Sequence, residues 1–151
     1  QRHKRYRLFD LSYRKAPPLV PPWWAIGIPE RIDASGAVLK ALDEEALTAA
    51  LRFLAADGIE AIAICFLFSF VNPTHEQRAA AIARNILPDC FVTCSSDIFP
   101  QFREYERAST AVVNAYLGPR VAKYLQRMSE ELDRAGVEVP LHLMQSNGGV
   151  I

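Results

Sequence analysis

The sequence lacks the features by which nucleic-acid-binding and membrane proteins are recognised. Basic and acidic residues cancel at 17 each among 151 residues, and no long block of like charge occurs. Because no net field recruits a polyanion or an anionic membrane, the expected ligand is a small molecule, with neither nucleic acid nor membrane as a partner. The longest apolar run, residues 59–71, contains Glu60 and is too short for a bilayer span, which takes about 20 residues.

Cysteine, histidine and glycine are also scarce. The three cysteines, Cys65, Cys90 and Cys94, are an odd number and fit a reducing compartment, so a cytoplasmic location is expected. Cys90 and Cys94 have no matching second pair and the three histidines are scattered, so no metal site is predicted. With seven glycines, the sequence shows neither common pattern of glycine-rich phosphate-binding loop.

What is present is the pattern of an α/β protein, in which apolar strand-like runs alternate with amphipathic helical spacing. The expected elements are, in chain order, an extended proline-rich connector at 15–24, two short strands around a turn within 25–42, a helix that Asp43 caps and Gly58 ends, a central strand at 59–71, a helix at 72–87, a strand at 91–95, two helices within 103–135 divided at Gly118 and Pro119, and a strand at 139–144.

The order of these elements predicts how they pack. Strand, helix and strand over 59–95 form a βαβ unit, so its two strands are predicted to pair in parallel. In the last helix one face repeats at helical spacing and is predicted to be core; its residues are Val121, Tyr124, Leu125, Met128 and Leu132.

Ligands of open α/β sheets bind beyond the carboxyl ends of strands. Among three such ends, residues 145–149 are the most site-like, because short polar side chains stand beside glycines that let backbone amides approach a ligand. A small turn has the same composition and is the alternative interpretation. The candidate substrate- or nucleotide-binding residues are Ser146, Asn147, Gly148 and Gly149.

A second candidate is the charged run at 103–107, which precedes Asn114 on an otherwise apolar helix. If the run is buried, its charges must be paired, and an arginine could hold a substrate carboxylate. An exposed, salt-bridged helix start is the equally weighted alternative. His75, next to a helix start, is expected to be an exposed residue of the capping turn, with acid/base chemistry as the less favoured alternative.

Four stretches together resemble the hydantoinase A / 5-oxoprolinase family, which includes ATP-dependent N-methylhydantoinases, 5-oxoprolinases and the acetone carboxylase beta subunit. The third stretch, at 95–119, is long and unusual enough to make chance a poor explanation of the resemblance. One departure is Phe68, where the family pattern leads us to expect histidine. The stretches are PERIDASGAVLKALD at 29–43, FSFVNPTHEQR at 68–78, SSDIFPQFREYERASTAVVNAYLGP at 95–119 and LMQSNGG at 143–149.

The resemblance implies a fold and a division of the chain. The fold is the actin/sugar-kinase/Hsp70-like ATPase type, so the chain is expected to form part of one lobe, with a mostly parallel sheet and flanking helices. Residues 1–106 match the later part of the family's N-terminal domain and residues 107–151 the start of the hydantoinase A domain. The family's phosphate-binding glycine motifs are expected upstream of residue 1 and downstream of residue 151, so the chain is expected to be an internal fragment.

The resemblance also implies a reaction, the ATP-dependent opening of a cyclic amide or imide ring through phosphorylation of its carbonyl oxygen. Such chemistry needs donors aimed at developing negative charge, and the candidate catalytic residues are Arg103, Arg107 and Asn114. ATP and Mg²⁺ are the implied cofactors of the full-length parent, with neither expected on this fragment, which is predicted to be inactive alone. The implied partners are the remaining domains and a second hydantoinase-type subunit. A ketone carboxylase subunit and a non-catalytic subunit-contact lobe are the alternatives.

Overall fold

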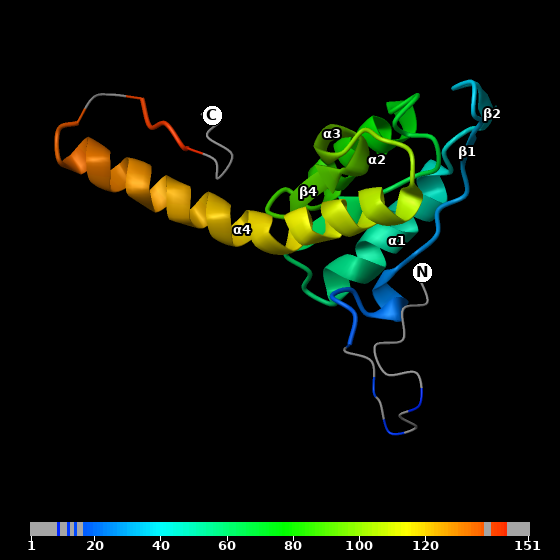
Figure 1. Ribbon diagram of the computed structural model, residues 1–151, viewed down its shortest axis with the longest axis horizontal. Coiled ribbons are helices and arrows are strands. Elements are labelled where there is room, and N and C mark those ends of the chain that lie inside the picture. The colour runs from blue at the N-terminus through cyan, green and yellow to red at the C-terminus, as the bar shows by residue number, and fades with distance from the viewer. Residues whose placement is uncertain (1–8, 10–11, 13, 15–16, 138–139, 145–151) are drawn as a thin grey trace.

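The computed structural model describes residues 9, 12, 14, 17–137 and 140–144. Helices and two small sheets alternate along the chain, which gives the expected α/β class (Figure 1). The elements are the 3-10 helix η1 (Pro22–Trp24), β1 (Arg31–Ile32), β2 (Val38–Lys40), α1 (Glu44–Ala56), β3 (Ala61–Ile64), α2 (Thr74–Ile86), β4 (Phe91–Cys94), α3 (Ser95–Ile98) and α4 (Glu104–Arg134).

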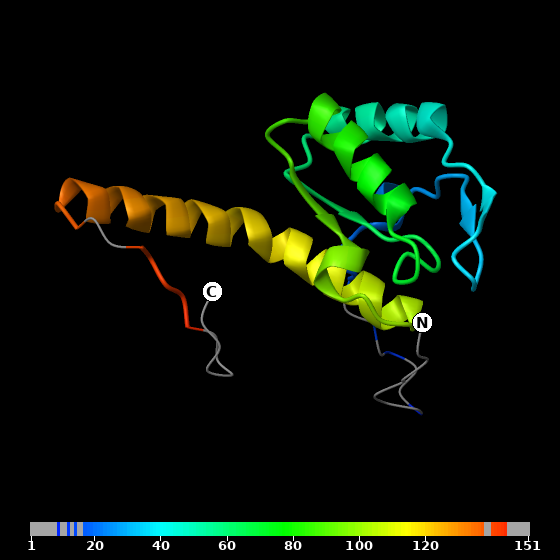
Figure 2. The ribbon, with the colours of Figure 1, turned by 90° about the horizontal axis from the view of Figure 1, so that it is seen from above.

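The centre of the fold is the β3–α2–β4 unit. Strands β3 and β4 pair in parallel, in a register that runs from Ala61 opposite Phe91 to Ile64 opposite Cys94. This confirms the predicted βαβ unit. Helices α1 and α2 cover one face of the strand pair and the first half of α4 covers the other (Figure 2).

The two faces of β3 are filled by side chains of different size. Ile64 packs into a buried cluster with Leu47 and Leu51 of α1 and with three alanines of α2. Since side chains alternate along a strand, Ala61 and Ala63 lie on the opposite face, toward α4, where Ala111 and Ala115 are buried. Small residues on both sides of that contact let the helix backbone approach the strand closely.

Local sequence determines the ends of α1 and the β1–β2 hairpin. Asp43 accepts a hydrogen bond from the backbone N–H of Ala46 at 2.9 Å, as predicted for its N-cap, and Gly58 follows the helix at a φ of 69°. In the hairpin, Asp33 accepts from the N–H of Ser35 and Gly36 adopts a φ of 86°. Both turns are therefore as the sequence predicts.

The predicted central strand at 59–71 is wrong in its length, since β3 ends at Ile64. The backbone groups of Phe66 are bonded to side chains instead of to a strand: its N–H donates to Glu76 and its C=O accepts from Arg107. Phe68 then adopts a φ of 54°, which turns the chain. Competition from these two charged side chains is the physical reason for the early end of the strand.

The predicted division of the last helix at Gly118 and Pro119 is also wrong, because α4 continues through Pro119. Proline removes one hydrogen bond, while the residues around it are mostly good helix formers. Beyond Pro119 the helix extends away from the body of the fold (Figure 1). Its predicted core face is not core in this chain: Val121 is 50% exposed and Tyr124 63%.

Two further expectations differ from the structure. Within the proline-rich connector, η1 forms one 3-10 turn, because proline at a first helical position needs no N–H partner. Of the strand expected at 139–144, residues 140–143 are irregular and only Met144 forms an isolated bridge; this segment lies away from β3 and β4 in both views. Among the described residues, no helix has the length and apolar character to cross a membrane.

Gly118→Ala is expected to destabilise the chain although alanine is the better helix former. A Cβ at this position would lie 2.4 Å from ring atoms of Phe91. The shifts that such overpacking forces on the neighbouring atoms cost about 1–3 kcal/mol. Urea denaturation measures the change in the free energy of unfolding. In a Phe91→Leu background the same glycine substitution should become neutral or stabilising; equal destabilisation in both backgrounds would refute the contact with the ring.

Candidate functional site

The candidate site is the carboxyl edge of the β3–β4 pair. The two strands end side by side at Ile64 and Cys94; β3 is followed by the turn at 67–71 and β4 runs directly into α3. In open α/β sheets this edge is where ligands bind. We refer to the turn at 67–71, α3 and residues 99–103 as the carboxyl edge.

A buried carboxylate joins the two strand ends. Glu76, in the first turn of α2, has no exposed surface. Its Oε1 accepts from the N–H of Phe66 at 2.8 Å and from the hydroxyl of Ser95 at 2.7 Å, and its Oε2 accepts from the N–H of Ser96 at 2.8 Å. One side chain therefore binds both the segment after β3 and the start of α3.

A buried guanidinium binds the same two segments from the opposite side. Arg107, near the start of α4, is also fully buried. It donates from Nε to the Ser95 hydroxyl at 3.0 Å and through its terminal nitrogens to the C=O of Phe66 at 2.6 Å and of Gln101 at 3.1 Å. Because Ser95 donates to Glu76 and accepts from Arg107, its hydroxyl links the two opposite charges.

Backbone strain is concentrated at this edge. Among the described residues, the two non-glycine positions with positive φ are Phe68 at 54° and Arg103 at 80°, and both belong to the carboxyl edge. Such conformations cost of order 1–3 kcal/mol and cluster at functional sites. The Arg31 guanidinium lies 6.0 Å from the centre of the Phe68 ring, and the Ser96 hydroxyl oxygen is buried without a hydrogen-bond partner among the described residues.

The sequence-predicted residues of the charged run separate into two groups. Arg103 is exposed, with its guanidinium 5.3 Å from the centre of the Phe102 ring, whereas Arg107 is enclosed by the carboxyl edge. Each of the two alternatives for the run thus holds for one of its arginines: Arg107 is buried and hydrogen-bonded, and Arg103 is exposed. Catalytic roles for these arginines remain predictions; in this chain Arg107 presents no surface to a ligand.

Asn114 lies farther along α4 and is half-buried. Its amide donates to the hydroxyl of Thr93 in β4 at 3.0 Å, so the partner that a polar residue requires inside a packed helix is present. Seven residues separate it from Arg107, which is about 10 Å along a helix. The remaining candidates, Ser146, Asn147, Gly148 and Gly149, lie outside the described residues.

Sequence reasoning missed two buried carboxylates. Glu76 stands in the first turn of a helix, where an exposed acidic residue is common, so its spacing gave no sign of burial. Glu30 lies 2.7 Å from Nδ1 of His75, and both side chains are at least nine-tenths buried. The expectation that His75 is exposed is therefore wrong, because packing of the segment before β1 against α2 encloses it.

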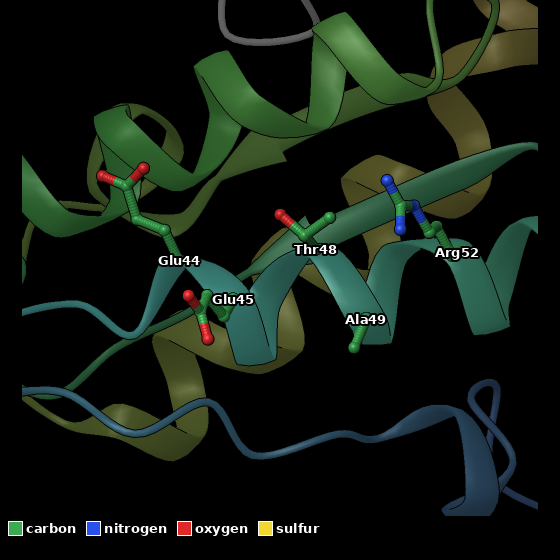
Figure 3. Close-up of a pocket in the computed structure, with 5 residues that line it drawn as sticks. All are labelled: Glu44, Glu45, Thr48, Ala49 and Arg52. Carbon is green, nitrogen blue, oxygen red and sulfur yellow. The ribbon is translucent and has the colours of Figure 1, made fainter.

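A hollow on α1 and the side chains that could bind a metal are poorer candidates for chemistry. A hollow of about 340 Å³ lies on the outer side of α1, and Figure 3 shows the side chains of this one helix that line it. Its Glu44 is already bound to Arg78, whose hydrogen bonds lower the pKa of that carboxyl. Among the described residues, no group of three or more histidine, cysteine, aspartate or glutamate side chains could hold a metal ion.

The β3–α2–β4 unit and its braced carboxyl edge define a protein of the open-sheet α/β class. The family of the hydantoinase/oxoprolinase N-terminal region matches residues 1–87, and the hydantoinase/oxoprolinase family matches residues 107–151. The chain belongs to the hydantoinase/oxoprolinase family, which confirms the resemblance. Helix α4 is continuous across the start of the second match.

Individual relatives are similar along most of this chain. The caprolactamase alpha subunit of Pseudomonas jessenii is 42% identical over 94% of this chain and 20% of that protein. The crystal structure of the ATP-dependent caprolactamase from the same organism matches with a TM-score of 0.86 at 41% identity, over 99% of this chain and 22% of that one. The 5-oxoprolinase of Saccharomyces cerevisiae is 39% identical over 76% of this chain and 9% of that protein.

A second solved relative has a different activity in its description. The nucleotide-free structure of an acetone carboxylase matches with a TM-score of 0.80 at 29% identity, over 92% of this chain and 20% of that one. The chain thus spans about a fifth of the caprolactamase and acetone carboxylase chains that it matches.

Glu76→Gln is expected to lower the free energy of unfolding by about 2–4 kcal/mol, the range for breaking a buried charged network. All three partners of the carboxylate are donors, so the glutamine NH₂ group must face another donor. Urea denaturation measures the loss. The matched control is Glu44→Gln, which breaks an exposed ion pair with Arg78 and should change stability little. Equal effects of the two substitutions would show that Glu76 does not brace the edge.

Cys94 is expected to be a poor nucleophile. Burial raises the pKa of its thiol to about 11, from an ordinary 9.0, and the carboxylates of Asp97 and Glu76 add to this effect. At about pH 8 the raised pKa leaves about 100-fold less thiolate, so alkylation by iodoacetamide should be at least that much slower in the folded chain than in denaturing urea. Mass spectrometry of the labelled peptide measures both rates. Rapid labelling of Cys94 in the folded chain would contradict its burial.

Proposed function

We propose that this chain is one region of a longer enzyme that opens cyclic amide rings at the expense of ATP. The observation that supports this most directly is the 42% identity to a caprolactamase subunit over 94% of the chain. The similarity to 5-oxoprolinase, whose name also denotes action on a cyclic amide, supports the same class of reaction. The substrate class we infer is a lactam or a related cyclic amide such as a hydantoin or 5-oxoproline.

Within that enzyme, we infer that the region forms part of one lobe of an actin-like ATPase fold. The parallel β3–β4 pair covered by helices on both faces supports this interpretation. Residues 1–106 and 107–151 then belong to two family domains that share helix α4. The carboxyl edge would form a rigid wall beside the ligand. Of the two arginines in the charged run that are predicted to be catalytic, Arg103 is the exposed one.

The proposed enzyme uses ATP and Mg²⁺ as cofactors, but the described residues do not form a binding site that fits them. A phosphate cradle needs consecutive backbone N–H groups lined by glycine. Within the described part of the chain the glycines are isolated: Gly36 and Gly58 lie in turns, and Gly118 lies in a helix against Phe91. No chemical step is therefore assigned to ATP on these residues. A cytoplasmic location remains a prediction.

A second candidate function is carboxylation of a ketone. The acetone carboxylase structure, with a TM-score of 0.80, supports this alternative. Because the caprolactamase relative is described as an alpha subunit, we also propose that the full-length enzyme works with a second subunit.

The test is an assay of the full-length protein, with its second subunit, for phosphate release from ATP. Caprolactam, 5-oxoproline and hydantoin are offered separately, and acetone is offered together with bicarbonate. We expect release to depend on one of the cyclic amides. Release that depends only on acetone and bicarbonate would replace the proposal by the second candidate, and release with none of the four would reject both.

The 151-residue chain itself is the negative control for the ATP assay. Because the described residues lack a phosphate cradle, we expect no ATP hydrolysis and at most weak nucleotide binding by isothermal titration with ATP and Mg²⁺. Sub-micromolar binding by this chain would refute the argument from the missing cradle.

A further inference from the structure

Phe68, which follows the end of β3, has a backbone conformation that its side chain disfavours. Its φ is 54°, and among the described residues outside glycine only Arg103 also has a positive φ. Side chains other than glycine rarely adopt such values, and asparagine, aspartate and histidine are several-fold enriched among those that do. For a residue as bulky as phenylalanine the conformation is an outlier, so contacts made by neighbouring residues must hold it.

The residues on both sides of Phe68 supply these contacts. Before it, the N–H of Phe66 donates to Glu76 at 2.8 Å and the C=O of Phe66 accepts from Arg107 at 2.6 Å. After it, the guanidinium of the same Arg107 lies 5.3 Å from the centre of the Phe70 ring. One buried arginine thus contacts the turn on either side of Phe68 and restrains its backbone.

The ring of Phe68 contributes little to the hydrophobic core. Phe66 packs against the buried cluster of α1, α2, β3 and β4, whereas Phe68 is half-buried and lies outside that cluster. The centre of the Phe68 ring lies 6.1 Å from that of Phe70 and 6.0 Å from the Arg31 guanidinium. Both distances are near the outer limit at which such contacts stabilise. Packing of this ring therefore does not account for the strain of its backbone.

A ligand contact accounts for the strain better. Strained conformations persist only where the surrounding structure over-determines them, and they cluster at active sites and ligand clamps. Phe68 belongs to the carboxyl edge, which is where open α/β sheets bind ligands. A side chain whose backbone is already fixed loses less conformational freedom when a ligand binds, and this favours affinity.

The surface around Phe68 is mainly apolar. Within the carboxyl edge the charged residues are Asp97 and Arg103. Methylene groups are transferred favourably from water to such a surface, so it fits the hydrocarbon part of a ring. The large apolar side chains of this edge that are exposed in the chain are Leu67, Val71, Ile98 and Phe102.

We propose that Phe68 is a specificity-determining residue whose ring contacts the methylene groups of the substrate ring. The restrained turn holds the aromatic side chain in place before the substrate binds. The substrate class is an uncharged cyclic amide with a largely hydrocarbon ring, for which caprolactam is the probe. This inference rests on the proposed function, because it assigns a contact within the same substrate site.

Phe68→His in the full-length protein, with its second subunit, tests the contact. Histidine suits a positive φ better than phenylalanine, so the melting temperature should equal or exceed that of the unsubstituted enzyme. Loss of an apolar contact to methylene groups should raise the Kd for caprolactam about tenfold. The Kd for hydantoin, whose ring is mostly amide groups, should rise much less. Isothermal titration with a non-hydrolysable ATP analogue present measures both constants.

Phe53→His is the matched control. Phe53 is an exposed phenylalanine of α1, outside the carboxyl edge, and the two residue types have similar helix propensity. This substitution should leave the melting temperature and both Kd values unchanged. If Phe68→His lowered the melting temperature and left the Kd for caprolactam unchanged, the ring would be structural and the proposal overturned. An equal rise of both Kd values would also overturn it, because the effect would not be selective.

Binding and turnover separate this inference from the proposed function. An unsubstituted enzyme that binds caprolactam without releasing phosphate from ATP would reject the proposed function, while the Kd values of Phe68→His would still decide the role of the ring. An unsubstituted enzyme that releases phosphate with hydantoin or 5-oxoproline but does not bind caprolactam would support the proposed function and overturn this inference.

Discussion

The buried Glu76 carboxylate is the constraint on which the rest of the structure depends. A charge without exposed surface is tolerated only when hydrogen bonds replace its water shell, and three donors do so here. Two of these donors belong to the segment after β4 and one to the segment after β3. Arg107 binds the same segments, and the Ser95 hydroxyl links it to the carboxylate. The positions of the two strand ends and of α4 are therefore fixed by one network.

Elements that depend on near neighbours could be predicted from the sequence. The Asp43 cap, the turn at Gly36 and the helix end at Gly58 all involve contacts within a few residues, so their signals are local. The parallel pairing of β3 and β4 followed from the order of elements. The end of β3 could not be predicted, because Phe66 is bound by side chains 10 and 41 residues away in sequence.

The candidate site was predictable in place but not in detail. Strand order located the carboxyl edge, and the density of charge at 103–107 indicated the run at its border. The burial of Arg107 involves the Ser95 hydroxyl, which also binds Glu76 of α2, and Glu76 has the sequence pattern of a surface residue. The apolar face at 121–132 shows the opposite error: its spacing is that of a core helix, but none of its five residues is fully buried in the described part of the chain.

Helix α4 joins the carboxyl edge to a distant part of the molecule. Its 31 residues correspond to a rod of about 46 Å. Arg107 anchors one end in the charge network, while the other end projects beyond the sheet (Figure 2). A tilt of about 10° at the anchored end would displace the far end by about 7 Å over the intervening 40 Å or so. A rearrangement around Ser95 that tilted α4 would therefore be geometrically amplified at residues 121–134.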